Sequence, residues 1–213
     1  MDDLNTLWFD YASQNSSSEP TLLQELRRET WQKALNPRMI SGHLQGRLLA
    51  FISKICKPEK ILEIGTYTGY ATLCLAEGLQ PHGYLITIDK NEELSPIQEK
   101  YFKKSTFRKQ IKNFIGEAQS IVPTLDETFD LVFIDGQKTE YKTYFDAIYS
   151  KVKKGGIILS DNVLWHGKVL EPNKYTDLET QSILEYNKFL KEFEGVDNLI
   201  LPLRDGLSIC LKK

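Results

Sequence analysis

The sequence contains little cysteine. Cys56, Cys74 and Cys210 are scattered over 213 residues and form no CxxC pair. An odd, scattered set argues against a disulfide framework and lacks the usual spacing of zinc ligands. We therefore expect reduced thiols and a cytoplasmic protein.

Long apolar runs and an excess of one charge are also missing. No run approaches the roughly 20 apolar residues that a membrane-spanning helix needs, and the formal net charge is −2. Residues 1–14, MDDLNTLWFDYASQ, lack the basic and apolar regions of a signal peptide. These absences argue against a membrane protein and against a global basic field that attracts nucleic acid or a membrane surface.

From Lys60 onward, strand patterns alternate with helix patterns. The predicted strands are KILEIG, YLITID, IKNFIG, FDLVFID and GIILSD, and helices are predicted over 68–77, 95–104, 117–125, 140–152 and 177–193. Residues 198–213 predict an antiparallel hairpin around Asp205-Gly206. This order predicts an α/β fold: a Rossmann-like, doubly wound, mainly parallel seven-stranded sheet with an antiparallel C-terminal hairpin and helices on both faces.

Residues 1–37 are predicted to form an N-terminal helical extension, followed by the main domain over 38–213. The polar stretch 13–20 separates two helical patterns, and Asn36-Pro37 predicts a break before a further helix over 44–55. Apolar residues at helical spacing, Leu4, Leu7, Trp8 and Tyr11, predict either a homodimer contact or packing within the monomer.

The first strand ends in a loop, EIGTYTGY, that is suited to close approach by a ligand. Gly65 and Gly69 permit a tight turn, but Tyr67 and Tyr70 crowd the space that a dinucleotide diphosphate needs. Asp89 ends the second strand, where a carboxylate can accept hydrogen bonds from ribose hydroxyls. This combination favours S-adenosylmethionine over NAD. The alternative is a glycine turn that serves only helix packing.

The fourth and fifth strands end in oxygen-bearing side chains. Asp135 follows one strand, and Asp161 and Asn162 follow the other. Neighbouring strands in a doubly wound sheet bring these ends together, about 5 Å apart. Two carboxylates and an amide suit Mg²⁺, although Mn²⁺ and Ca²⁺ use similar oxygen ligands. The alternative is a strand-ending turn, which Asp and Asn also favour.

Two side chains near these strand ends are candidate general bases. Lys138 lies three residues after Asp135, and an ammonium beside a divalent cation loses its proton more readily. His166 lies in the loop after Trp165 and titrates near neutral pH. The alternatives are a solvated lysine and a histidine that only lines the rim.

These motifs together resemble the cation-dependent class I O-methyltransferases, the family of catechol and caffeoyl-CoA O-methyltransferases and their bacterial relatives. The resemblance covers about residues 38–213 and rests on ILEIGTYTGY, IDK at 88–90, FIDGQK with Tyr141, and DNVLWHG. It implies transfer of a methyl group from S-adenosylmethionine to a hydroxyl of a metal-chelated vicinal diol on a small aromatic substrate. It also implies that the N-terminal region shapes substrate choice and dimer contacts.

The resemblance assigns roles to individual residues. It implies metal ligands at Asp135, Asp161 and Asn162, a catalytic base at Lys138 and a substrate-pocket aromatic at Trp165. Its cofactor residues are Met39, Glu63, Gly65, Thr66, Tyr67, Asp89, Ala118 and Gln119, with Asp135 alongside them. Ala71 stands where the family often has a cofactor-binding serine.

Three rival functions follow from other features. The stretch YFKKSTFRKQIK, residues 101–112, is basic and aromatic, which suits a methyltransferase acting on the wobble 5-hydroxyuridine of tRNA. A solvated helix and loop explain the same residues. A non-catalytic adenosine-binding module would not need the three metal ligands, and the tyrosines of the first loop disfavour an NAD dehydrogenase.

Overall fold

The computed structural model describes residues 2–213, with side chains from Leu7 onward; the side chain of Leu4, which belongs to the predicted apolar stripe, lies outside the described residues. The helices are α1 (Asp2–Gln14), α2 (Thr21–Lys33), α3 (Gly42–Cys56), α4 (Tyr70–Ala76), α5 (Ser95–Lys104), α6 (Ala118–Ile121), α7 (Tyr141–Tyr149) and α8 (Leu178–Glu192). The strands are β1 (Lys60–Ile64), β2 (Tyr84–Asp89), β3 (Ile111–Ile115), β4 (Phe129–Ile134), β5 (Val152–Asp161), β6 (Val196–Leu201) and β7 (Leu207–Lys212).

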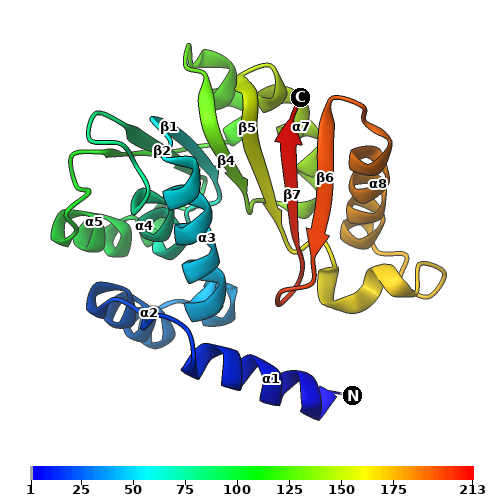
Figure 1. The fold of residues 1–213 in the computed structure, drawn as a ribbon, viewed down its shortest axis with the longest axis horizontal. Coiled ribbons are helices and arrows are strands. Elements are labelled where there is room, and N and C mark those ends of the chain that lie inside the picture. Colours follow the sequence, from blue (N-terminus) through cyan, green and yellow to red (C-terminus); the bar gives the residue numbers. More distant parts are fainter. Residues whose placement is uncertain (1) are drawn as a thin grey trace.

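One seven-stranded sheet organises the chain, in the order β3-β2-β1-β4-β5-β7-β6 (Figure 1). Strands β1 to β5 pair in parallel, and β7 pairs antiparallel with both β5 and β6. This arrangement confirms the predicted doubly wound sheet with its antiparallel C-terminal hairpin.

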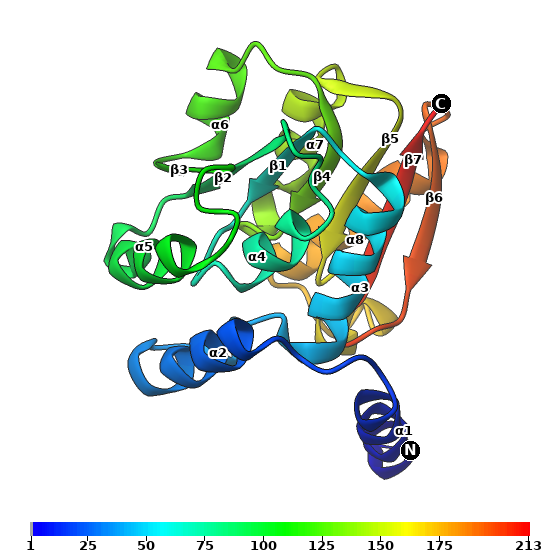
Figure 2. The ribbon, with the colours of Figure 1, turned by 60° about the vertical axis from the view of Figure 1, so that its left-hand side comes forward.

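Two apolar clusters lie on opposite faces of the sheet. One cluster joins the sheet to α6, α7 and α8, and the other joins it to α3, α4 and α5, with α2 packed outside them (Figure 2). Because side chains alternate along a strand, Leu62 faces the first cluster and Ile61 the second. Helix α1 projects away from this body in both views (Figures 1 and 2).

Element boundaries differ most from the sequence prediction at two helices. The helix predicted over 117–125 is a single turn, α6, followed by a 3₁₀ turn over Val122–Thr124. The helix predicted over 140–152 ends at Tyr149, and β5 begins at Val152. The pairing register of β4 with β5 shifts between Phe129 and Leu131. This bulge allows the polar residues 153–155 to be part of β5.

None of the helices in residues 2–213 is long and apolar enough to cross a membrane. All three cysteines are free thiols, and burial raises the pKa of Cys74 to about 12 and that of Cys210 to about 11.

Candidate active site

The strand register brings the predicted oxygen ligands together at one edge of the sheet. Ile134 of β4 pairs with Ser160 of β5, so Asp135 and Asp161 follow the strands side by side. Asp161 is 5% exposed, and its Oδ2 accepts a hydrogen bond of 2.6 Å from Gln45 Nε2. Its Oδ1 accepts another, of 2.8 Å, from the backbone N–H of Asn162.

The two carboxylates resist being charged together. Burial raises the pKa of Asp135, and burial followed by the charge of Asp135 raises the pKa of Asp161 to about 7. A divalent cation would relieve both the burial penalty and the mutual repulsion. Among the described residues no three His, Cys, Asp or Glu side chains cluster as a metal site, so a cation here would take two carboxylates from this set, to which the sequence prediction adds the Asn162 amide. Such a hard, incomplete set fits Mg²⁺, which keeps several waters or substrate oxygens.

Asn162 adopts a left-handed backbone conformation, with φ of 58°. Asparagine tolerates this region better than most residues. This backbone conformation therefore accounts for an asparagine at this strand end, and it does not conflict with the predicted role of Asn162 as a metal ligand.

Lys138 lies at the centre of the polar contacts beside Asp135. Its Nζ donates to Asp135 Oδ1 at 3.0 Å, to Gly136 O at 3.2 Å and to Tyr141 Oη at 2.8 Å. Tyr141 Oη in turn donates to Asp161 O at 2.9 Å. Burial raises the pKa of Tyr141 well above its usual value, so this phenol remains a hydrogen-bond donor. The predicted base thus contacts one predicted ligand directly and the other through Tyr141.

His166, the competing base, lies at the rim. Its side chain is 71% exposed, and its Nδ1 is 3.6 Å from Asp205 Oδ2. The residues Trp165, His166 and Gly167 all have positive φ, which marks a strained turn. The half-buried Trp165 places its ring centroid 6.0 Å from Lys138 Nζ, and its indole N–H has no hydrogen-bond partner among the described atoms.

The loop after β1 passes very close to the end of β4. Gly65 has a φ of 97°, and a Cβ there would lie 2.1 Å from Asp135 O. Only glycine fits such an approach. Gly69, with a φ of 89°, precedes the first turn of α4. Gly65 therefore brings the predicted cofactor loop against the predicted metal site.

Asp89 holds this loop in place. Its Oδ2 accepts from Tyr67 N at 2.7 Å and its Oδ1 accepts from Asn91 N at 2.9 Å. A carboxylate has about four acceptor positions, so both oxygens keep capacity for ribose hydroxyls. Thr66 is also fixed, because its Oγ1 lies 2.5 Å from Thr87 Oγ1.

Glu63 lies beneath the loop and is fully enclosed by protein. Its Oε2 accepts hydrogen bonds from Thr72 and, at 2.6 Å, from Thr87, while its Oε1 has no partner among the described atoms. Burial raises the pKa of Glu63 to about 8. The orphaned oxygen is the place where a proton, or a donor from a bound ligand, would satisfy the group.

The other predicted cofactor residues divide by exposure. Ala71 and Ala118 are buried, whereas Met39 is 61% exposed and Gln119 is exposed. Met39 ends a 3₁₀ turn over Pro37–Met39, before α3.

Two side chains at the site carry no local sequence signal. Gln45, on α3, reaches Asp161 across 116 positions of the chain. Arg204, between β6 and β7, donates from Nη1 to Gln45 Oε1 at 3.3 Å and to Ile40 O at 2.8 Å, and its charge lowers the pKa of Asp135 against the effect of burial.

Three of the five basic side chains in residues 101–112 contact other residues of the protein, whereas Arg108 and Lys109 are exposed. Lys103 pairs with Glu99 and Lys104 with Glu25, each at 2.8 Å. Lys112 Nζ lies 3.6 Å from the centroid of the Tyr84 ring. These contacts do not favour a phosphate-binding face and leave the tRNA interpretation without structural support.

Comparison with known proteins agrees with the geometry. A family described as O-methyltransferase matches residues 13–213. Caffeoyl-CoA O-methyltransferase 1 of Arabidopsis thaliana is 32% identical over 206 residues, covering 90% of this chain and 78% of the relative. Catechol O-methyltransferase of Niastella koreensis is 32% identical over 178 residues, covering 79% of this chain and 80% of the relative.

A solved structure extends this similarity to the whole fold. The methyltransferase PaMTH1 of Podospora anserina, solved with bound SAH, superposes with a TM-score of 0.91 at 28% identity, covering 99% of this chain and 96% of that one. The strand-end carboxylates, the glycine loop and these similarities lead to one conclusion: the chain belongs to the O-methyltransferase family.

Proposed function

We propose that this O-methyltransferase moves a methyl group from S-adenosylmethionine to one hydroxyl of a cation-chelated vicinal diol, on a catechol or a hydroxycinnamoyl-like phenol. The observation that carries the proposal is the position of the buried Asp161 beside the half-buried Asp135, with Lys138 Nζ 3.0 Å from Asp135 Oδ1. A structural Lys138–Asp135 ion pair would not need the buried Asp161 carboxylate beside it.

Asp135, Asp161 and Asn162 would hold the divalent cation, with Mg²⁺ the best match to their oxygen atoms. When bound, the cation would supply Lewis-acid polarisation of the diol, and S-adenosylmethionine would supply the methyl group. Gln45 orients Asp161 by donating to its Oδ2. Such outer-shell hydrogen bonds fix the direction of a ligand's lone pairs.

Lys138 would take the proton from the reacting hydroxyl. Its Nζ donates hydrogen bonds to three acceptors, Asp135, Gly136 and Tyr141, and these bonds hold the amine in one position. Asp135 Oδ1, which now accepts from Lys138 Nζ, would be shared with the cation when the cation is bound. The exposed His166, turned toward Asp205, is a less suitable base.

The cofactor would lie along the loop that Gly65, Thr66 and Tyr67 form, with Asp89 at the ribose and Glu63 beneath the loop. Met39, Ala71, Ala118 and Gln119 complete the proposed cofactor residues. The fit rests on the spare acceptor capacity of Asp89.

We further propose that the enzyme works in the cytoplasm as a homodimer. The exposed Leu7, Trp8 and Tyr11 give α1 an apolar surface that its own body leaves uncovered. Sedimentation of a monodisperse monomer at micromolar concentration would refute the dimer.

Methyl transfer with catechols, caffeic esters and hydroxyuridine tRNA, each with Mg²⁺ and with EDTA, tests the activity. We expect metal-dependent product on a diol, a loss of at least about 100-fold in Asp161→Asn and Lys138→Met, and unchanged SAH binding in both. Asp130→Asn is the matched control, because Asp130 lies at the opposite end of β4 and accepts from Lys60 N at 2.9 Å. Full activity in EDTA, or activity only on tRNA, would contradict the proposal.

A further inference from the structure

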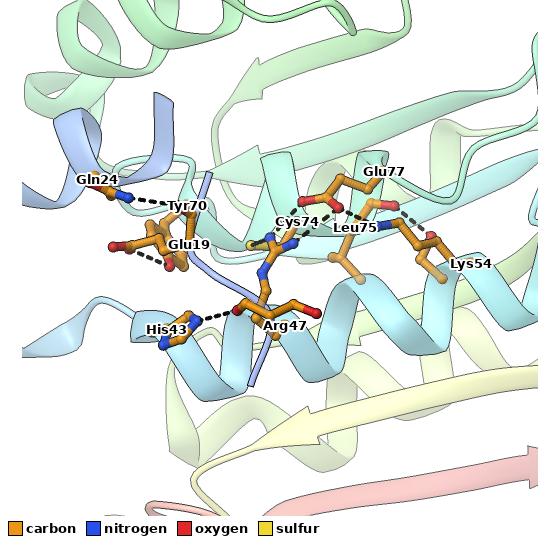
Figure 3. Close-up of polar contacts among 11 residues, drawn as sticks. Glu19, Gln24, His43, Arg47, Lys54, Tyr70, Cys74, Leu75 and Glu77 are labelled. Atoms are coloured by element: carbon orange, nitrogen blue, oxygen red, sulfur yellow. Dashed lines mark hydrogen bonds and ion pairs between the residues drawn. The ribbon is translucent and has the colours of Figure 1, made fainter. Parts of the chain in front are cut away.

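Residues 17–36 lie against the outer side of the loop after β1. Tyr67 Oη donates to Asn36 O at 2.9 Å. Tyr70 Oη donates to Glu19 Oε1 at 2.7 Å, as Figure 3 shows. Thr30 and Thr68 join through their hydroxyls at 3.1 Å. Three side chains of the loop and the first turn of α4 therefore each contact a different part of the N-terminal segment.

Two of these contacts are buried. Thr30 and Thr68 are fully buried, Tyr70 is 2% exposed and Glu19 is 8% exposed. Arg27 fixes the Glu19 carboxylate with two donors, Nη2 at 2.9 Å and Nε at 3.1 Å. Because breaking a buried hydrogen bond leaves an unsatisfied polar group, the segment and the loop are expected to move together.

The inner side of the same loop is held by the sheet and by α5. Tyr67 N donates to Asp89, and Gln98 Nε2 donates to Tyr67 O at 2.6 Å. The loop itself contains two glycines in left-handed conformations, at Gly65 and Gly69. A glycine-rich segment has many alternative conformations, so its shape depends on what holds it from both sides.

We propose that residues 17–36 are a positioning element for the cofactor loop, so that docking of this segment and binding of S-adenosylmethionine strengthen each other. The inference rests on the proposed role of the loop in binding the cofactor. It gives the N-terminal extension a part in cofactor affinity, in addition to any part in substrate choice or dimer contacts. Glu19, Thr30 and Asn36 act through Tyr70, Thr68 and Tyr67.

A matched pair of tyrosine variants tests this coupling. Tyr70→Phe removes the hydroxyl that joins Glu19 to the start of α4. Tyr101→Phe removes an equivalent hydroxyl, which is equally buried and donates to Glu29 of α2 at 2.8 Å, but from α5, which contacts the loop through other side chains, Gln98 and Phe102. Both variants lose one phenol–carboxylate hydrogen bond to the N-terminal segment, so their melting temperatures should fall alike.

Of the two tyrosine variants, only Tyr70→Phe should weaken cofactor binding. We expect the Kd for SAH, measured by calorimetry, and the KM for S-adenosylmethionine to rise about fivefold with unchanged kcat, as the loss of one hydrogen bond implies. Tyr101→Phe should change neither by more than about twofold. Thr30→Val, on α2 itself, should repeat the effect from the other side of the contact.

Linkage requires the reverse effect as well. Saturating SAH should slow hydrogen exchange at the amides of residues 24–33 in the wild type and in Tyr101→Phe, and should slow it less in Tyr70→Phe. Unchanged SAH affinity in both Tyr70→Phe and Thr30→Val, or an equal loss in Tyr101→Phe, would overturn the inference, as would a wild type that does not bind SAH. SAH binding needs neither acceptor nor cation, so inactivity on every diol with this coupling intact would refute the proposed diol chemistry alone.

Discussion

Replacement of Glu63 by glutamine should remove a large pH dependence of stability. Burial raises the pKa of Glu63 to about 8 from an ordinary 4.5. The folded protein therefore binds a proton between these values that the unfolded chain has released. Stability contributed by the protonated group is fully present below pH 4.5 and is lost as the pH rises through 8.

The magnitude follows from about 1.4 kcal/mol per pKa unit. Between pH 5 and pH 8 the wild type should lose roughly 3–4 kcal/mol of unfolding free energy relative to Glu63→Gln, because the amide does not titrate. The amide can still bond to Thr72 and Thr87, the two present partners of Oε2. Other titrating groups are common to both proteins and cancel in the difference.

Urea unfolding at pH 5 and pH 8, followed by tryptophan fluorescence, measures this difference. Glu29→Gln is the control. The hydrogen bonds from Lys100 and Lys33 lower the pKa of Glu29 to about 2, so its stabilisation is present above pH 4.5 and is lost only as the pH falls toward 2. Its cost should be the same at pH 5 and pH 8. Parallel pH profiles for the wild type and Glu63→Gln would refute the reasoning.

Three further predictions concern the strand ends. Gly65→Ala places a Cβ 2.1 Å from Asp135 O, so this variant should lose SAH binding and at least about 3 kcal/mol of unfolding free energy, measured in urea. Gly155→Ala is the control, because Gly155 has a φ of 76° but no atom within 4 Å of a Cβ, and it should cost only about 1–2 kcal/mol. Equal costs would contradict the steric argument. Mg²⁺ affinity, measured by calorimetry, should rise about tenfold from pH 6 to pH 8, because a proton on Asp161, whose pKa is about 7, competes with the cation. An affinity that does not change with pH would exclude this carboxylate as a ligand. Gln45→Leu should weaken Mg²⁺ binding about 10- to 100-fold and leave SAH affinity unchanged, and parallel losses of both would indicate general unfolding instead.

The sheet and the paired carboxylates could be predicted from the sequence because both depend on local patterns. Apolar runs separated by helical patterns define parallel strands, and parallel strands end at one edge. The β4–β5 register then places Asp135 beside Asp161 without any further information. The prediction was wrong at the start of β5, because Lys153, Lys154 and Gly155 read as a polar turn before the bulge extends the strand.

Gln45 could not be predicted, because its contact depends on how α3 lies across the sheet. It is 1% exposed yet lies in the polar segment SGHLQG, where a glutamine is ordinarily a surface residue. Only the tertiary structure shows that this amide donates to Asp161 Oδ2 and accepts from Arg204.

The contacts of Arg204 connect the two ends of the chain at the site. Its guanidinium binds the backbone oxygens of Ile40 and Ser41, immediately before α3, and carries a positive charge toward Asp135. Because every residue has a backbone oxygen, substitution of the Ile40 and Ser41 side chains would leave these acceptors in place. The β4–β5 register places the candidate metal ligands, whereas Gln45 and Arg204, which lie around them, come from other segments of the chain. We therefore predict that any difference in methyl acceptor between this chain and its 32%-identical relatives arises from the segments around the strand ends.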